Sequence, residues 1–156
     1  MEGFREALIK NELTLDDRYI VNIKHTDDDD LRHNDGFNKK AGYYAMKKLL
    51  LLKKDCPTAI FVSSDIQAAG AMKAIQESGL KIPEDIAIVG FDGIELSEYL
   101  GLTTMKQPMQ EMGMLAVEQL INRIQNSLEN TVFKKLFHPE LIIRDTCGAR
   151  LLKNKS

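Results

Sequence analysis

The sequence predicts an α/β fold in which helices pack against a mainly parallel β-sheet. Residues 86–89 (IAIV) form a short apolar run rich in β-branched side chains, which is typical of a strand covered on both faces. Residues 59–62 (AIFV) form a second run of this kind. Apolar residues at helical spacing separate the two runs, and this alternation favours parallel strands joined by right-handed helical crossovers.

The first part of the chain has the pattern of one helix followed by one strand. Phe4, Ala7 and Leu8 recur at helical spacing, which predicts a short helix. Residues 19–23 (YIVNI) then have the composition of a strand. Residues 25–40 are polar and include four consecutive aspartates at 27–30, so we expect a surface loop there.

The next helix is expected to begin at Gly42 and to bury a stripe made of Tyr43, Met46, Leu49 and Leu50. The helix after residues 59–62 is expected to begin at residues 63–65 (SSD), because Ser and Asp side chains accept hydrogen bonds from the free amides of a first turn. We assign the side chain of Asp65 to capping the start of this helix. Small residues then make this helix slim, which implies close packing against another surface; they are Ala68, Ala69, Gly70 and Ala71.

The end of this helix leads directly to a candidate ligand contact. Gly79 can adopt the left-handed conformation that closes a helix, and Pro83 prevents the helix from resuming. The strand at 86–89 follows and stops near Asp92. Because ligands of open parallel sheets bind outside the carboxyl ends of the strands, Asp92 is a candidate for contact with a ligand.

The last third of the chain follows a different pattern. Residues 102–105 are short and extended, and Pro108 suits the first turn of a helix. That helix has an apolar stripe of Met112, Ala116, Leu120 and Ile124. Residues 132–143 are expected to be extended, with an interruption at Pro139, and residues 151–156 to form a frayed tail.

Composition limits the function classes. The 156 residues, 44% of them hydrophobic, match one ordinary globular domain. With 21 Lys and Arg against 23 Asp and Glu, the chain has a formal charge of −2, so it is not expected to bind DNA by itself. No apolar run is long enough for a membrane span, Cys56 and Cys147 lie in no motif, and the opening residues lack the core of a signal peptide. We therefore expect a cytoplasmic location and a truncated protein.

Three blocks, at residues 57–72, 79–92 and 102–108, resemble the effector-binding domain of the LacI/GalR family of transcriptional regulators. Residues 3–8 and 141–144 extend the likeness to nearly the whole chain. The resemblance implies a periplasmic-binding-protein-like type I fold, a three-layer sandwich with Rossmann-like lobes. It also implies that the helix-turn-helix headpiece and most of the amino-side lobe lie outside this chain.

The resemblance divides the chain into parts of two lobes. Residues 1–104 and 141–150 correspond to the carboxyl-side lobe, residues 105–140 to a fragment of the amino-side lobe, and residues 151–156 to a tail. The implied function is a ligand-sensing and dimerisation domain of a repressor, which binds a small molecule such as a sugar between its lobes. The implied partners are this effector, a second copy of the protein, and operator DNA through the headpiece alone, with no membrane and no cofactor.

Asp92 matches the family's ligand-binding aspartate at the strand tip, and a carboxylate suits sugar hydroxyls because it accepts several charge-assisted hydrogen bonds. The alternative is a simple turn at Asp92 and Gly93. Ser64 stands where many relatives carry a ligand-binding asparagine. Because a hydroxyl has a shorter reach than an amide, the effector of a familiar relative should not be assumed for this chain.

Three further ligand candidates each have a structural alternative. Phe37 matches an aromatic residue that stacks on sugars in some relatives, or it is covered by a local apolar patch. Phe61 resembles a pocket residue of purine-sensing relatives, although an aromatic residue in a buried strand favours the core. Gln107 lies at the crossover between lobes, where some relatives use glutamine on the ligand, or it is only a polar residue before a helix. Ala69 and Leu100 resemble residues of the surface that pairs in family dimers.

Other classes are less well supported. The aspartates at 27–30 lack the alternating spacing, glycine and closing glutamate of a calcium loop, and His25, His33 and His138 have no partner at metal-ligand spacing. The sequence offers no glycine-rich phosphate loop and no nucleophile with a base, so we expect no enzyme and no metal site. The main alternative is a periplasmic sugar-binding protein of a transporter, which shares the two-lobed architecture. A signal peptide on the full-length gene would favour that alternative, and a helix-turn-helix would favour the regulator.

Overall fold

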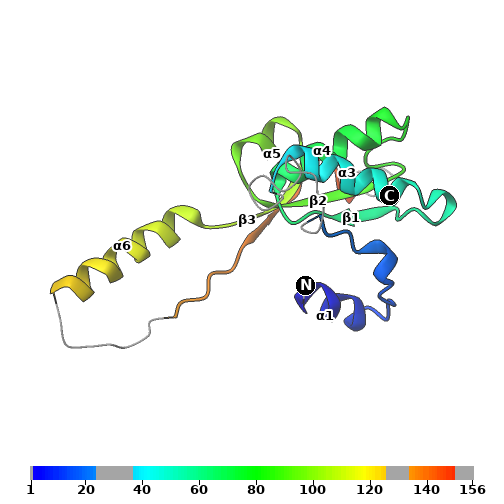
Figure 1. Ribbon diagram of the computed structural model, residues 1–156. Coiled ribbons are helices and arrows are strands. Elements are labelled where there is room, and N and C mark those ends of the chain that lie inside the picture. Colours follow the sequence, from blue (N-terminus) through cyan, green and yellow to red (C-terminus); the bar gives the residue numbers. More distant parts are fainter. Residues whose placement is uncertain (1, 24–36, 126–133, 150–156) are drawn as a thin grey trace.

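The fold is built around a four-stranded sheet in the order β1-β2-β3-β4 (Figure 1). The computed structural model describes residues 2–23, 37–125 and 134–149. The strands are β1 (Ala59–Phe61), β2 (Ala87–Asp92), β3 (Thr103–Lys106) and β4 (Glu140–Ile142). The pairs β1·β2 and β2·β3 are parallel and β3·β4 is antiparallel, so the prediction of a mainly parallel sheet is confirmed.

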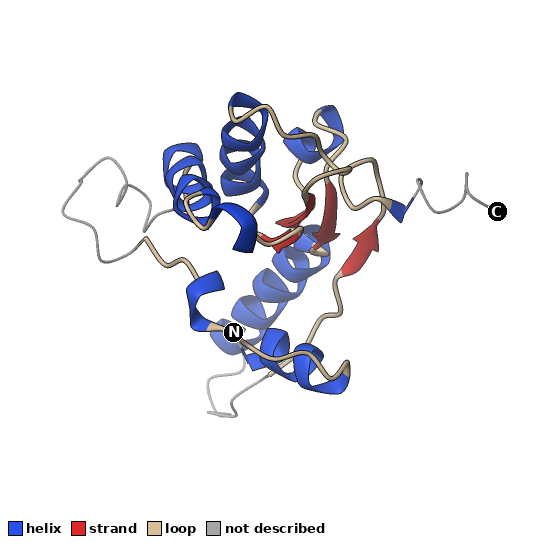
Figure 2. Cartoon of the chain, turned by 90° about the vertical axis from the view of Figure 1, so that its right-hand side faces the viewer, coloured by secondary structure: helices blue, strands red, loops and turns tan. Residues whose placement is uncertain are grey.

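Helices α3 (Lys39–Leu50) and α4 (Asp65–Glu77) cover one face of the sheet, and α1 (Glu2–Lys10) lies on the other side (Figures 1 and 2). Helix α5 (Glu95–Tyr99) follows β2, and the short 3-10 helix η3 (Lys53–Asp55) precedes β1. This arrangement gives the layered α/β architecture that the sequence predicts. None of the residues of α1 is buried.

Helices α3 and α4 approach each other closely because each carries a glycine at the contact. A Cβ atom on Gly42 would overlap the carbonyl group of Gln67, and one on Gly70 would overlap the carbonyl oxygen of Lys39. The prediction that the slim helix packs closely against another surface is therefore confirmed, and that surface includes α3 of the same chain.

The start of α3 differs from the prediction. The helix begins at Lys39 rather than at Gly42, because the side chain of Asn38 accepts a hydrogen bond from the backbone amide of Ala41 at 2.8 Å and so caps an earlier turn. The surface loop predicted over residues 25–40 therefore extends too far, because residues 39 and 40 belong to α3. Most of the predicted loop lies outside the described residues.

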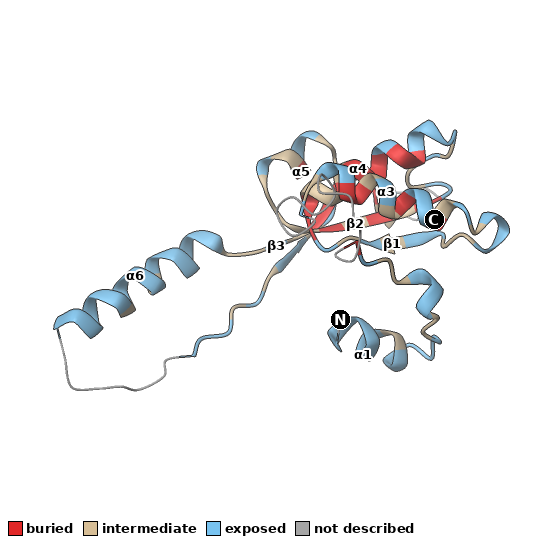
Figure 3. Cartoon of the chain, in the orientation of Figure 1, coloured by how far each residue is buried: buried red, intermediate tan, exposed pale blue. Residues whose placement is uncertain are grey.

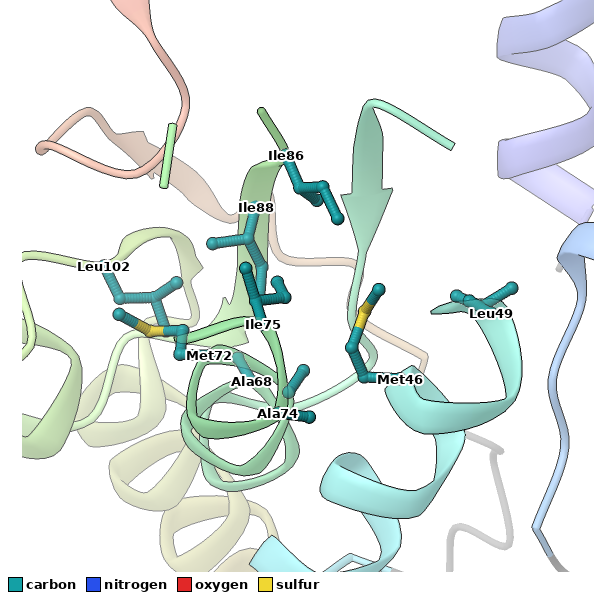
Figure 4. Close-up of a cluster of buried hydrophobic side chains, with 10 residues drawn as sticks. Met46, Leu49, Ala68, Met72, Ala74, Ile75, Ile86, Ile88 and Leu102 are labelled. Carbon is teal, nitrogen blue, oxygen red and sulfur yellow. The ribbon is translucent and has the colours of Figure 1, made fainter. Parts of the chain in front are cut away.

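The hydrophobic core lies between these two helices and the sheet (Figure 4). Met46 and Leu49 of the stripe predicted in α3 are buried in it, and Tyr43 and Leu50 pack against its edge. The remaining buried members come from α4, from β2 and from the residues that directly precede β2 and β3; they are Ala68, Ala71, Met72, Ala74, Ile75, Ile86, Ile88 and Leu102.

The strand predicted at residues 19–23 is wrong. Tyr19 ends the 3-10 helix η1 (Asp17–Tyr19), and residues 20–23 are assigned to no strand. Ile20 has extended backbone angles of φ −99° and ψ 107°, as its sequence suggests, but a strand also needs a neighbour in register. In the described sheet, β1 pairs only with β2, so residues 20–23 contribute Val21 and Ile23 to apolar packing instead.

Beyond β3 the chain extends away from the sheet (Figure 1). Helix α6 (Met109–Gln125) contains no buried residue, and Figure 3 shows it as exposed along most of its length. The segment from residue 134 then returns to β4, which pairs with β3. The predicted apolar stripe is therefore present on a helix, and all four of its residues are exposed. In the described ranges, no helix combines the length and apolar character needed to cross a membrane.

Candidate functional site

The candidate residues gather where the parallel strands end. Strand β1 ends at Phe61, β2 at Asp92 and β3 at Lys106, and Asp92 is in register with Lys106. Because the strands are parallel, these ends share one edge of the sheet. Gln107 follows β3 directly, so the fold places it beside Asp92 as well.

Asp92 lies at the centre of this edge. Its Oδ1 atom accepts a hydrogen bond from Nε2 of Gln107 at 2.9 Å, and its carbonyl oxygen accepts one from the Gln107 amide at 3.0 Å. Its φ angle is +123° and that of Gly93 is +74°, so the backbone changes direction in the short connection between β2 and α5, which is called the turn below. The ligand role and the turn are compatible, because the turn determines where the carboxylate is directed.

Burial is the main cause that raises the pKa of the Asp92 carboxyl above its ordinary value. The negative charge of Asp65 acts in the same direction, whereas the hydrogen bond from Gln107 acts against the shift. A partly desolvated carboxylate that retains few partners is suited to accept hydrogen bonds from a polar ligand.

Asp65 has a role that sequence reasoning missed. Ser64 is the N-cap of α4, with its Oγ 3.3 Å from the Gln67 amide, so the assignment of Asp65 to capping is wrong. The Asp65 side chain is instead fully buried below the edge. Its Oδ2 accepts hydrogen bonds from the amides of Gly93 at 2.8 Å and Ile94 at 3.1 Å, and its Oδ1 accepts one from Thr104 Oγ1 at 2.6 Å.

The sequence carries one indirect signal for this contact. Gly90 lies in β2, where a side chain would normally be expected to pack, and a Cβ atom there would overlap Oδ1 of Asp65. A glycine inside a strand often marks the close approach of another group. The identity of that group depends on contacts between distant parts of the sequence, so local patterns could not supply it.

The two phenylalanines are more exposed than a core role allows. Phe61 is 51% exposed and packs edge to face against Phe91, with ring centroids 6.4 Å apart. The core alternative for Phe61 is therefore wrong. Phe37, which precedes the cap of α3, is 48% exposed, so the described residues do not cover it with an apolar patch. Ser64 is only 3% exposed, and its hydroxyl contacts Gln67.

The two candidates for a dimer surface lie on α4 and just after α5. Ala69 and Leu100 are each partly buried, and Leu100 packs against the core. Helices α4 and α5 lie on the same side of the sheet in Figure 1. Their neighbour Tyr99 is exposed, which leaves apolar surface beside Leu100.

The described residues contain no group of three or more His, Cys, Asp or Glu side chains that could hold a metal ion. The aspartates at 27–30, together with His25 and His33, lie outside those residues.

Comparison with known proteins agrees with this architecture. The periplasmic binding protein-like domain family matches residues 1–147. The chain is 38% identical over 149 residues to the HTH-type transcriptional regulator MalR of Clostridium butyricum, covering 94% of this chain and 40% of that protein. It is 36% identical over 152 residues to the ribose operon repressor of Haemophilus influenzae, covering 96% and 40%. The chain thus spans about 40% of the length of the curated relatives it matches.

Solved structures show the same likeness. A putative LacI regulator from Bacillus cereus subsp. cytotoxis matches with a TM-score of 0.79 and 27% identity, covering 93% of this chain and 47% of that one. A complex of the transcriptional regulator CelR with cellobiose matches with a TM-score of 0.79 and 27% identity, covering 92% and 40%. A LacI family regulator from Enterococcus faecium with bound ribose matches with a TM-score of 0.72 and 28% identity, covering 94% and 49%. The chain therefore belongs to the periplasmic binding protein-like domain family, and the relatives and solved structures that it resembles here are transcriptional regulators and repressors.

Proposed function

We propose that this chain is part of the ligand-sensing and dimerisation domain of a LacI-type transcriptional repressor, which binds a small molecule such as a sugar. The observation that carries the proposal is the meeting of Asp92 and Gln107 at the carboxyl edge of the parallel strands. Relatives of this fold have been solved with ribose and with cellobiose, which supports a sugar or a related polar metabolite as the ligand class.

The edge offers the two kinds of group that a sugar requires. The Asp92 carboxylate accepts hydrogen bonds from hydroxyl groups, and Gln107 both donates and accepts. The exposed ring of Phe61 offers an apolar face against which the C–H face of a sugar can pack. Phe37 and Ser64 complete the proposed set, and a change of the Ser64 side chain rotamer would release its hydroxyl for the ligand.

The proposed mechanism is a shift between open and closed arrangements of two lobes. Residues 1–104 and 141–150 form most of the carboxyl-side lobe, and residues 105–140, which include α6, belong to the other lobe. A ligand shifts this equilibrium only through its different affinity for the two arrangements, so contacts that it makes with both lobes matter most. The proposed boundaries between the lobes fall within β3 and β4, which pair with each other, so Gln107 would lie close to the connection.

The proposed assembly is a homodimer that pairs through the surface around Ala69 and Leu100. Operator DNA would be bound by a helix-turn-helix headpiece outside this chain, since a net charge of −2 gives the chain itself little attraction for DNA. This role implies a cytoplasmic protein that is not an enzyme and needs no cofactor. The named relatives are regulators and repressors, which favours this proposal over the transporter-linked binding protein.

The proposal is tested by thermal melting of the full-length protein against sugars, sugar phosphates and purines. A ligand at about 100 times its Kd stabilises the native state by about 2.7 kcal/mol, which raises the melting midpoint measurably. Asp92→Ala should abolish this rise, whereas Glu84→Ala, which removes an exposed carboxylate, should leave it unchanged. A rise that persists in Asp92→Ala would contradict the assigned site.

A further inference from the structure

Asp65 connects three parts of the candidate site through one buried carboxylate. It begins α4, and it accepts hydrogen bonds from the turn after β2 and from Thr104 in β3. We propose that Asp65 is a positioning residue: it holds the turn at Gly93 and Ile94 and thereby directs the Asp92 carboxylate toward the ligand. This inference rests on the proposed function, because it concerns the same site.

The turn has a conformation that needs support. Asp92 has a φ angle of +123°, which is costly for a residue with a side chain and persists only where surrounding contacts fix it. Both amides that follow, those of Gly93 and Ile94, donate to the same oxygen of Asp65. One oxygen therefore accepts from two successive amides, and this pair of hydrogen bonds fixes the turn.

The second oxygen of Asp65, Oδ1, holds the Asp65 carboxylate in place through a hydrogen bond to β3. Oδ1 accepts a hydrogen bond from the hydroxyl of Thr104, which is fully buried in β3. Strand β3 also leads to Gln107, whose side chain donates to Asp92. Asp65 therefore contacts β3 and the turn after β2, the two segments that lead to Gln107 and Asp92, and it directly follows Ser64 in the sequence. One side chain thus sets the spacing between Ser64, Asp92 and Gln107.

Two substitutions of Asp65 distinguish a role in positioning the turn from a general contribution to the stability of the fold. In Asp65→Asn, the carbonyl oxygen can still accept from both amides, and the new NH₂ group can donate to the Thr104 hydroxyl. In Asp65→Leu, the size is similar but both acceptors are lost. Ile88→Val serves as the control, because it removes one methylene group from the core away from the edge.

Hydrogen exchange in the full-length protein tests the turn without any ligand. For Asp65→Leu we expect exchange at residues 93 and 94 to accelerate by roughly tenfold or more relative to that of β2, which reports opening of the sheet. Asp65→Asn should stay within about threefold of the wild type. If Asp65→Leu does not fold, Thr104→Val, which removes only the hydroxyl anchor, should show the same selective acceleration. A uniform acceleration, or equal losses in the Asn and Leu variants, would overturn the proposal.

Titration with D-ribose, cellobiose and lactose then tests the consequence for binding. For a sugar that binds the wild type, Asp65→Leu should weaken the affinity by roughly tenfold or more, while Asp65→Asn and Ile88→Val should change it by less than about threefold. Equal weakening in Asp65→Leu and Ile88→Val would contradict positioning. If none of the three sugars binds the wild type, the sugar form of the proposed function fails, whereas the exchange result still decides the role of Asp65.

Discussion

Gln107 donates a hydrogen bond from its side-chain amide to the carboxylate of Asp92 at 2.9 Å, and this contact joins the ends of β2 and β3. The backbones of the same two residues are joined by a second hydrogen bond of 3.0 Å. Each side chain is a ligand candidate by itself, so under the proposed function a ligand would meet them as a pair. Gln107 both orients the carboxylate and occupies one of its acceptor positions.

Asp92→Asn should stabilise the protein at neutral pH and change its stability little near pH 3. Burial raises the pKa of Asp92 in the folded state, so in the interval from the ordinary Asp value up to this raised pKa the native state binds more protons than the unfolded state. The free energy of unfolding therefore falls as the pH rises through that interval. Asparagine is neutral, tolerates positive φ and can still accept from Gln107. Urea unfolding at several pH values measures the effect.

The same variant should lose ligand affinity, because an amide oxygen is a weaker acceptor than a carboxylate. A gain in stability together with a loss of affinity is the trade-off expected of a functional residue. A variant that is less stable than the wild type at neutral pH would contradict the assigned cost of burying Asp92.

Gly70→Ala should destabilise the fold by about 1–3 kcal/mol, because it overpacks a close helix contact. The new methyl group would overlap the Lys39 carbonyl oxygen and lie 2.8 Å from the Tyr43 amide nitrogen. The matched control is Gly113→Ala in α6, where no atom lies within 4 Å of the added carbon. This control should be stabilising by about 0.4–1 kcal/mol, because alanine restricts the unfolded chain and favours helix. Chemical denaturation that ranks the two variants in the reverse order would contradict the packing.

Local patterns in the sequence were sufficient to predict strands β1 and β2, a cap within residues 63–65, and Met46 and Leu49 as buried residues of α3. Each depends on neighbouring residues, through apolar runs, helical spacing or hydrogen bonds within one turn. The strand predicted at residues 19–23 failed because pairing needs a neighbour that local composition cannot provide. The role of Asp65 was missed for a related reason: its three donors lie 28, 29 and 39 residues away in the sequence. The candidate edge itself was predictable, since strand ends of a parallel sheet meet by topology.

Ala69→Arg should disrupt the proposed homodimer. Ala69 lies partly buried on α4, where a long charged side chain would separate two surfaces that approach closely and would leave a charge to be buried. Lys73→Arg, on the exposed side of the same helix, keeps the charge and serves as the control. Light scattering of the full-length protein should show a halved mass for Ala69→Arg alone. An unchanged mass for Ala69→Arg would refute the assignment of this surface.

Helix α6 should cause the chain, when produced by itself, to dimerise, exchange segments or aggregate. Its stripe includes Met112, Leu120 and Ile124, of which Leu120 is 58% exposed, and no residue of the helix is buried. A continuous apolar surface of this kind favours association. Leu120→Glu combined with Ile124→Glu should lower the mean mass seen by size-exclusion chromatography with light scattering. Gln125→Glu adds a charge to the same helix without removing apolar area, so it should leave the association in place. A wild-type chain that remains monomeric at high concentration would show that the exposed stripe does not drive association.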